Sequence, residues 1–271
     1  MARSAQRLDL ARLHSRGLPR RSAVLAAHPD DETIGAGALL CRSAGARVFH
    51  LTDGAPRDPR LWTRAFPGGR DEYAALRRDE ARRALAIAGV PPARIECLGA
   101  VDQEAIDSAA HLARSLADRL RSLRPPIVVV HPYEGGHPDH DAASLIAHAA
   151  AALLGPMAPA LVEMTSYHAE GAALVAEEFL PAPEPIVASP LDGDVRARKQ
   201  RMIAAYASQS EVLKEFPLRA ERFRTAPAAH FEQPPHGGEL HYERMGWRRG
   251  DDWRSQARVA LEQLGLWEKL R

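Results

Sequence analysis

Two clusters of histidine and acidic residues hold most of the chemistry that this sequence can perform. The first, HPDDE, spans residues 28–32, and the second, HPDHD, spans residues 137–141 and follows His131. Adjacent acids repel one another and burial raises their pKa values, so the first cluster is costly to bury unless a cation binds there. Alone, it is equally typical of a solvated acidic loop at a helix N-terminus. The second cluster has five His and Asp residues within eleven positions, which favours a shared site.

His28, Asp31 and His140 are the predicted ligands of one catalytic zinc ion. Zinc in catalytic sites takes three protein ligands from His and Asp or Glu, and keeps a further position for water. His28 and Asp31 flank a tight turn, and His140 can complete the set from the second cluster. Fe²⁺ or Co²⁺ would also fit this mixed nitrogen and oxygen set.

Three more residues of the clusters are expected to take part in the reaction. Asp30 lies beside the predicted ion without being needed as a ligand, so it is suited to act as general base for the zinc-bound water. His137, as an imidazolium across the substrate, would stabilise a developing oxyanion. Asp139 would hold the His137 ring in orientation. The expected reaction class is metal-assisted hydrolysis.

Each cluster follows a predicted buried strand and precedes a predicted helix. The apolar runs 23–27 and 127–130 both end at a His-Pro pair, and proline disfavours further strand pairing. The carboxyl ends of the strands in an open parallel sheet line one crevice. We therefore expect the two clusters to face each other across that crevice.

Alternating strands and helices over the rest of the chain predict an α/β fold, with a parallel sheet flanked by helices. On helix 70–88, Tyr73 and Leu85 are expected to be buried and residues 77–80 to point mostly outward. We expect one domain over residues 1–271, with a core at about 22–168 and a lid with helices at about 169–271. The long loop 58–69 and segment 219–249 are predicted to be irregular. Predicted strands are 23–27, 46–51, 94–98, 127–130, 161–167 and one around 185–188; predicted helices are 2–16, 33–43, 70–88, 104–124, 141–154, 194–216 and 252–270.

Composition excludes several classes of protein. The chain has 271 residues, 45% hydrophobic and 26% charged, with a net charge of +1, so neither nucleic acid nor an anionic membrane is expected as the main partner. Its two cysteines, Cys41 and Cys97, form no disulfide framework and fit a reducing compartment. We find neither a signal peptide nor an apolar run near the ~20 residues that cross a bilayer, and expect a cytoplasmic protein.

The two motifs AHPDDE (27–32) and HPDH (137–140) strongly resemble the paired motifs of the LmbE/PIG-L deacetylase family. The segment with Lys199, Tyr206, Ser208 and Gln209 is similar to the C-terminal signature of that family, so the resemblance covers roughly residues 23–209. It implies a Rossmann-like fold and zinc-dependent removal of an acyl group, usually acetyl, from an N-acetylglucosamine-type amino sugar. It implies the same zinc ligands, base and electrostatic partner as the residues themselves suggest.

Two further site residues rest on the resemblance. Arg77 resembles a family arginine that binds the polar aglycone of the substrate, and Asp102 resembles an acid that contacts sugar hydroxyls. A solvated helix face and a turn are the alternative interpretations of these residues. One position departs from the family: where some members have a tyrosine that helps to stabilise the oxyanion, this chain has Gly135. Either another group substitutes, with Tyr133 as a candidate, or His137 acts with zinc alone.

Other functions remain open at this stage. An amidase that acts on a larger acyl conjugate would use the same residues. A phosphoesterase usually needs two metals and more bridging carboxylates. An inactive sugar-binding or scaffold protein would not need every catalytic residue to be present. Nucleotide binding, suggested by Gly35 and Gly37 after a strand, lacks the full fingerprint, and the acids would repel a pyrophosphate. The sugar, its aglycone, the acyl group and any homo-oligomer are not encoded in a recognisable motif.

Overall fold

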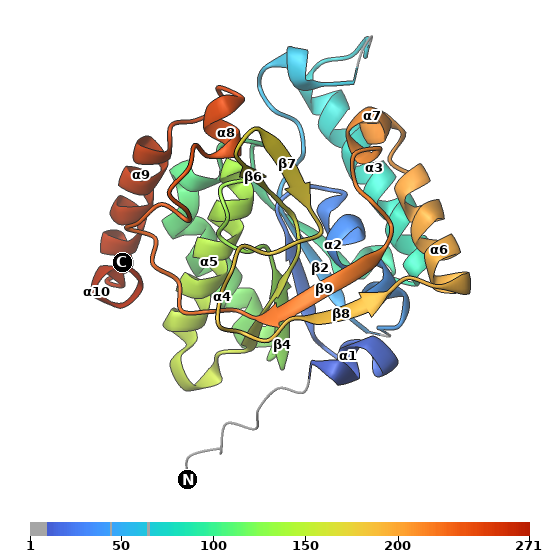
Figure 1. Ribbon diagram of the computed structural model, residues 1–271, viewed down its shortest axis with the longest axis horizontal. Helices are drawn as coiled ribbons and strands as arrows, with labels where there is room; N and C mark the ends of the chain where they lie inside the picture. Colours follow the sequence, from blue (N-terminus) through green and yellow to red (C-terminus); the bar gives the residue numbers. More distant parts are fainter. Residues whose placement is uncertain (1–9, 44, 64–65) are drawn as a thin grey trace.

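A twisted seven-stranded sheet with the strand order β3-β2-β1-β4-β5-β9-β8 forms the centre of the molecule (Figure 1). The structure, a computed structural model, describes residues 10–43, 45–63 and 66–271. Strands β1 to β5 are parallel, and β9 runs antiparallel to both of its neighbours. The strands of this sheet are β1 (Ala23–Ala26), β2 (Arg47–Thr52), β3 (Ile95–Ala100), β4 (Ile127–Val130), β5 (Ala160–Met164), β8 (Val187–Pro190) and β9 (Ala220–Thr225).

Helices cover both faces of this sheet (Figure 1). Helices α4, α5 and α9 share one hydrophobic cluster with the sheet, and α2, α3 and α6 share another on the opposite face. The predicted parallel sheet flanked by helices is therefore confirmed for β1 to β5. The helices are α1 (Ala11–Arg16), α2 (Asp31–Cys41), α3 (Arg70–Ala88), α4 (Ala109–Leu123), α5 (Pro138–Leu154), α6 (Gly193–Ala204), α7 (Ser210–Leu213), α8 (His241–Arg244), α9 (Gly250–Gln263) and α10 (Trp267–Leu270).

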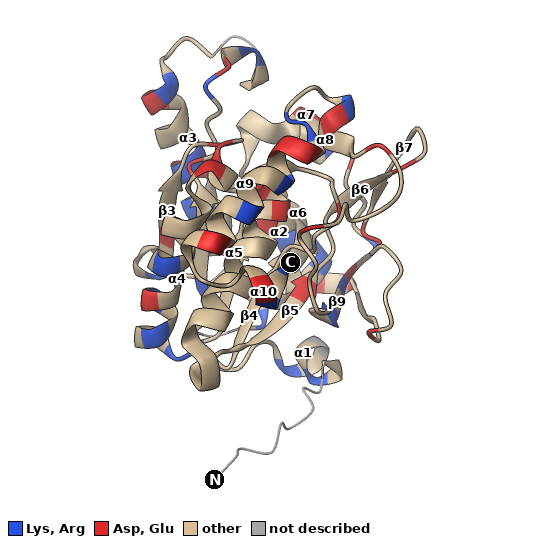
Figure 2. Ribbon diagram, turned by 90° about the vertical axis from the view of Figure 1, so that its left-hand side faces the viewer, with Lys and Arg blue, Asp and Glu red and all other residues tan. Residues whose placement is uncertain are grey.

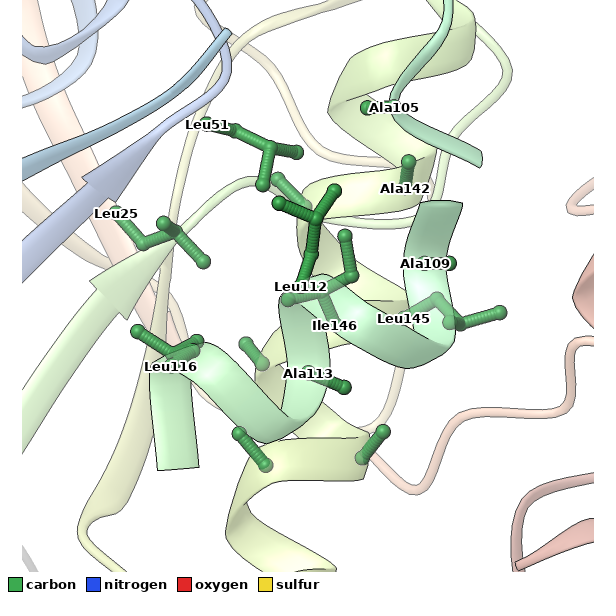
Figure 3. Packing of buried hydrophobic residues seen from close by; sticks show 14 of the residues in the cluster. Leu25, Leu51, Ala105, Ala109, Leu112, Ala113, Leu116, Ala142, Leu145 and Ile146 are labelled. Carbon is green, nitrogen blue, oxygen red and sulfur yellow. The ribbon is translucent and has the colours of Figure 1, made fainter. Parts of the chain in front are cut away.

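Strands β1 and β4 form the middle of the sheet because both are apolar at every position and buried on both faces. They pair in parallel with Leu25 opposite Val130. Below them, Leu112 and Leu116 of α4 pack with Ile146 of α5 (Figure 3). Each buried leucine or isoleucine contributes roughly 1.5–3 kcal/mol. This packing fixes where the two strands end, and so where the residues that follow them lie.

Residues of both signs of charge lie on the side of the molecule that Figure 2 shows. In Figure 2, basic and acidic residues are interspersed along α3, α4 and α9, in keeping with the net charge of +1. Among the described residues, no helix combines the length and the apolar character needed to cross a membrane.

The C-terminal half differs from the prediction. Segment 219–249 was expected to be irregular, but it contains β9 and α8. Strand β9 was missed because AERFRT has no apolar run; its Glu221 and Arg224 are nevertheless buried, since each is ion-paired.

Four predicted elements end elsewhere than expected. The predicted helix 252–270 is divided into α9 and α10. Strand 161–167 is divided: β5 ends at Met164, and Tyr167 begins a separate two-stranded hairpin, β6 (Tyr167–Glu170) with β7 (Ala173–Ala176). The predicted helix 194–216 breaks after α6, and α7 follows as a separate turn of helix. The predicted helix 2–16 is observed as α1 alone, since residues 2–9 lie outside the described part of the chain.

Helix α2, which begins at the first cluster, is kinked at Ala36, where φ is −142° and ψ is 16°. The kink frees backbone groups that C-terminal residues satisfy. Glu221 accepts the N–H groups of Ala38 (2.6 Å) and Leu39 (3.0 Å). Lys199 donates to the Ile34 carbonyl oxygen (2.6 Å) and to Glu221 (2.8 Å). One buried ion pair therefore fixes the direction of the helix that carries Asp31.

Replacing Lys199 with methionine tests this role. The substitution leaves Glu221 charged and unpaired where both side chains are 1% exposed, so we expect a loss of about 3–5 kcal/mol in the free energy of unfolding. Urea denaturation measures the change. The control is Lys214→Met, at a side chain that is 63% exposed, where we expect a loss below about 1 kcal/mol. Equal losses in the two variants would contradict the assignment.

Candidate metal and hydrolytic site

The two motif clusters meet at the carboxyl ends of the adjacent strands β1 and β4, where they form the floor of a cavity of about 210 Å³. The described wall of this cavity contains every predicted site residue except Asp139, which is fully buried behind it. The predicted residues in the wall are His28, Asp30, Asp31, Arg77, Asp102, His137 and His140.

The three predicted metal ligands are in direct contact through Asp31. Its Oδ2 lies 3.0 Å from His28 Nδ1, and its Oδ1 lies 3.2 Å from His140 Nε2. Burial alone would raise the pKa of Asp31, but His140 and His131 hold it well below its ordinary value. The carboxylate is therefore ionised and shared between two imidazole rings, as a ligand of a cation must be.

The donor set fits a divalent cation. Burial lowers the pKa of His140 to about 4, so its ring is neutral and offers a lone pair. The pKa of His28 is raised well above its ordinary value: burial opposes the shift, but contacts with Asp102, Asp139 and Asp31 outweigh it. The surrounding carboxylates favour a positive charge at His28. Without a metal ion the ring takes up a proton, and a bound metal ion would supply positive charge in its place.

Nearby histidines are less suited as ligands. One nitrogen each from His28, His137 and His140 lie within 4.8 Å of one another, and Asp31, His131 and His140 form a second such group. However, the Nε2 lone pair of His131 accepts the backbone N–H of Ala27 at 3.1 Å. This hydrogen bond supports His28, Asp31 and His140 as the ligand set over one that includes His131.

Ser166 positions His140, and sequence reasoning missed it. The Ser166 hydroxyl lies 2.8 Å from His140 Nδ1, on the side of the ring opposite Asp31. Partners of this kind fix the orientation of a metal-binding imidazole. Ser166 follows β5, outside both motifs and 26 residues beyond His140, so no local pattern marks it.

Asp30 has the environment expected of a general base. Its backbone is strained, with φ at 141°, because it forms the turn into α2. Its Oδ2 accepts a hydrogen bond from Arg77 Nη2 at 3.1 Å. Burial raises the pKa of Asp30 to about 7, although Arg77 opposes this shift. A carboxyl group with this pKa can both accept and release a proton at neutral pH.

Arg77 and Glu80 correct the prediction that residues 77–80 point outward, because both are buried. Arg77 donates from Nε to the Gly54 carbonyl oxygen at 3.1 Å, and Glu80 accepts from Ser208. A Cβ at Gly54 would come within 2.9 Å of Arg77 Nε, so this turn needs a glycine. Arg77 Nη1 has no partner among the described residues, which leaves a donor in the wall of the cavity.

His137 and Asp139 differ from their expected arrangement. His137 Nδ1 accepts the backbone N–H of Asp139 at 3.1 Å, and burial lowers the pKa of His137 to about 3. The ring is therefore neutral, with its proton on Nε2, rather than the expected imidazolium. The Asp139 carboxylate lies 3.1 Å from His28 Nε2 and so orients that ring instead. Asp102 lies 3.3 Å from the same nitrogen.

The tyrosine suggested as a substitute at Gly135 is not in the cavity. Tyr133 packs against Phe231 and Trp253, and its hydroxyl donates to the Gln233 carbonyl oxygen. Another tyrosine, Tyr167, lines the cavity instead. Burial raises the pKa of Tyr167, and the charge of Asp31 adds to the shift.

The residues of the C-terminal signature reach the site from the far end of the chain. Tyr206 donates to Glu32 Oε1 at 2.5 Å, and Gln209 donates to the Tyr73 hydroxyl at 2.9 Å. Of the four signature residues, Gln209 lines the cavity, together with Val212 and Phe216. The signature therefore acts mainly by anchoring α2 and α3.

The chain is similar to several known proteins. The model of the GlcNAc-PI de-N-acetylase (PIG-L) family matches residues 23–151. A 1D-myo-inositol 2-acetamido-2-deoxy-alpha-D-glucopyranoside deacetylase 2 from Saccharopolyspora erythraea is 31% identical over 228 residues, which cover 68% of this chain and 81% of the relative. One from Catenulispora acidiphila is 34% identical over 160 residues, 51% of this chain and 53% of the relative.

The chain thus spans about half the length of several curated relatives that it matches. Among solved structures, the N,N'-diacetylchitobiose deacetylase from Pyrococcus horikoshii aligns with a TM-score of 0.57 and 20% identity. The alignment covers 76% of this chain and 83% of that chain, so the two share a fold.

Replacing Ser166 with alanine tests whether this hydroxyl positions His140 for metal binding. Loss of the hydroxyl frees the ring, so we expect the affinity for zinc to fall about 10–100-fold with the fold retained. Competition with a chromophoric chelator measures the affinity, and circular dichroism checks the fold. The control is Ser144→Ala, since the buried Ser144 hydroxyl has no hydrogen-bond partner among the described residues. Equal zinc affinities in the two variants would exclude the positioning role.

Proposed function

The chain belongs to the PIG-L family of de-N-acetylases, and we propose that it is a zinc-dependent hydrolase of N-acylated amino sugars. The substrate is an N-acetylglucosamine-type sugar or its conjugate, and the group removed is an acyl group, acetyl in the simplest case. The observation that carries the proposal is the convergence of a base, a donor and a set of metal ligands on one cavity. The deacetylase names of the curated relatives support the same substrate class.

His28, Asp31 and His140 would hold the ion in this proposal. When bound, zinc would polarise the acyl carbonyl and make water acidic enough to deprotonate near neutral pH. A set of two imidazoles and one carboxylate suits zinc, and would also accept Fe²⁺ or Co²⁺. The predicted phosphoesterase alternative is less suitable, because the donors of this cavity serve one ion better than two.

Asp30 moves the proton of the attacking water. Its carboxylate takes the proton as the water oxygen bonds to the acyl carbon, and then gives it to the sugar nitrogen as the C–N bond breaks. The products are an amine and a carboxylic acid, which at neutral pH exchange a proton to become an ammonium ion and a carboxylate. Arg77 keeps Asp30 in place through the 3.1 Å hydrogen bond to Oδ2. The neutral His137 ring can donate its Nε2 proton in a hydrogen bond to the acyl oxygen as charge develops there.

Arg77 and Asp102 would also orient the sugar. Arg77 Nη1 is an unused donor, and Asp102 is held by His28 through Oδ1 at the wall of the cavity. A donor and an acceptor placed in this way suit the hydroxyl groups of a sugar, which both donate and accept. This role agrees with the one that the family resemblance implies for both residues.

The mouth of the cavity favours a conjugate with an apolar part. Leu61, which is 41% exposed, and Val212, which is 57% exposed, both line the cavity. Phe216 and Trp247 lie in the same wall. A cluster of exposed apolar side chains at the opening of a cavity indicates that an apolar part of a ligand binds there. This supports the second candidate function, hydrolysis of a larger acyl or aglycone conjugate.

Asp30→Asn tests the reaction. The amide cannot accept the proton of water, so we expect kcat to fall by about 10²–10⁴ with zinc content unchanged. Acyl release from a panel of N-acetylglucosamine derivatives, together with metal analysis, measures both. Chelation should abolish the activity of the parent protein and zinc should restore it. The control is Asp118→Asn, at a side chain that is 73% exposed on α4. Full activity of Asp30→Asn would contradict the role of Asp30 as general base.

Val212→Ser tests the apolar mouth. The substitution removes about 1 kcal/mol of apolar contact. We therefore expect KM to rise about fivefold for a long-chain alkyl glycoside of N-acetylglucosamine, and KM for the methyl glycoside to stay unchanged. Steady-state kinetics with both glycosides measure the difference. Val259→Ser, at an exposed valine on α9 outside the cavity, is the control. An equal change in KM for both glycosides would contradict the proposal.

A further inference from the structure

We propose that Tyr167 is a catalytic residue whose hydroxyl donates a hydrogen bond to the acyl oxygen of the substrate while negative charge develops there. This inference rests on the proposed function. It assigns a role to a residue that lies in neither motif, on a hairpin that the sequence did not predict. Tyr167 keeps its proton throughout, so it stabilises the oxyanion without entering the proton transfers of Asp30.

The position of Tyr167 is the first support. It lines the same cavity as the metal ligands and Asp30. Its ring meets His140 edge to face, with centroids 5.2 Å apart, and lies 5.7 Å from Phe216 and 5.6 Å from His241. Three rings around one phenol restrict its side chain to few orientations. A donor that is held in place before the reaction costs little to reorganise during it.

Two glycines permit this position. A Cβ at Gly136 would lie 2.0 Å from the Tyr167 carbonyl oxygen, far inside van der Waals contact. Gly135 has φ at +73°, and a Cβ there would come 2.6 Å from Leu240. Any side chain at residue 136 would therefore push β6 away from the second motif. Glycine therefore stands where some family members have a tyrosine, and the same Gly-Gly pair leaves room for Tyr167 beside the cavity.

The Tyr167 hydroxyl is free to bind a ligand. Within the described ranges 10–43, 45–63 and 66–271, no residue forms a hydrogen bond with it, whereas the Tyr73, Tyr133 and Tyr206 hydroxyls are all bonded. Phenols have an ordinary pKa of about 10 and are protonated donors at neutral pH. Tyr167 comes from β6 and His137 from the start of α5, so the two donors reach the cavity from different elements.

Tyr167→Phe tests the inference, with Tyr133→Phe as the matched control. The hydroxyl is lost while the ring that packs on His140 remains. We expect kcat for acyl release to fall about 10²–10³-fold, KM to stay within about twofold, and zinc content to be unchanged. Calorimetry adds a readout without turnover: the affinity for a phosphonate analogue with a tetrahedral anionic centre should fall in parallel, while the affinity for the amine product is retained. Tyr133→Phe should match the parent protein in each measurement.

Every other outcome contradicts either the role of Tyr167 or the proposed function. If Tyr167→Phe keeps the parent kcat, or loses zinc as well as activity, Tyr167 is not the donor to the acyl oxygen. A kcat loss without weaker binding of the phosphonate leads to the same conclusion. If the zinc-loaded parent protein releases no acyl group from any sugar of the panel, the proposed function fails and the role of Tyr167 fails with it. Activity of the parent protein therefore distinguishes a failure of the role of Tyr167 from a failure of the proposed function.

Discussion

The burial of several carboxylates beside several imidazoles is the constraint on which the rest of this structure depends. Asp30, Asp31 and Asp139 are almost fully buried at the ends of β1 and β4. Charges buried this closely are unstable unless each has a partner of opposite charge or a hydrogen-bond donor. The structure supplies Arg77 for Asp30 and histidine nitrogens for the other two. A cation bound to this set would remove the remaining repulsion, so the proposed metal binding would also stabilise the floor.

The elements around the floor exist largely to hold these partners. Arg77 comes from α3, and Ser166 from the residues after β5. The C-terminal half then anchors the helices that carry the clusters: Lys199 with Glu221 holds the kinked helix α2, and Tyr206 holds Glu32 at its start. Residues 169–271, predicted as a lid with helices, therefore also have a structural role. They complete the sheet through β8 and β9, and they fix the geometry of residues that precede them by well over a hundred positions.

Sequence reasoning reached the parts of the structure that local patterns encode. The strands before each cluster and the convergence of the motif residues follow from two apolar runs that end at His-Pro, and the parallel order of β1 to β5 follows from the alternation of strands and helices. It failed where a buried charge has a distant partner. Arg77 and strand β9 looked solvated because hydrophobic periodicity treats any charge as exposed, and their partners lie 47 and 61 residues away. Likewise, Asp139 was predicted to orient His137, but the tertiary contact places it against His28.

The floor and the walls of the cavity come from different kinds of segment. The floor comes from two short motifs at adjacent strand ends, where a small shift would break several hydrogen bonds at once. The walls include Leu61 in a 3-10 turn, Val212 in a short helix and Trp247 after α8, none of which contributes to the ion pairs of the floor. Substitution at these positions alters the shape and polarity of the mouth at little electrostatic cost. Chemistry is therefore encoded in the motifs, whereas selectivity must be deduced from side chains that only the fold brings together.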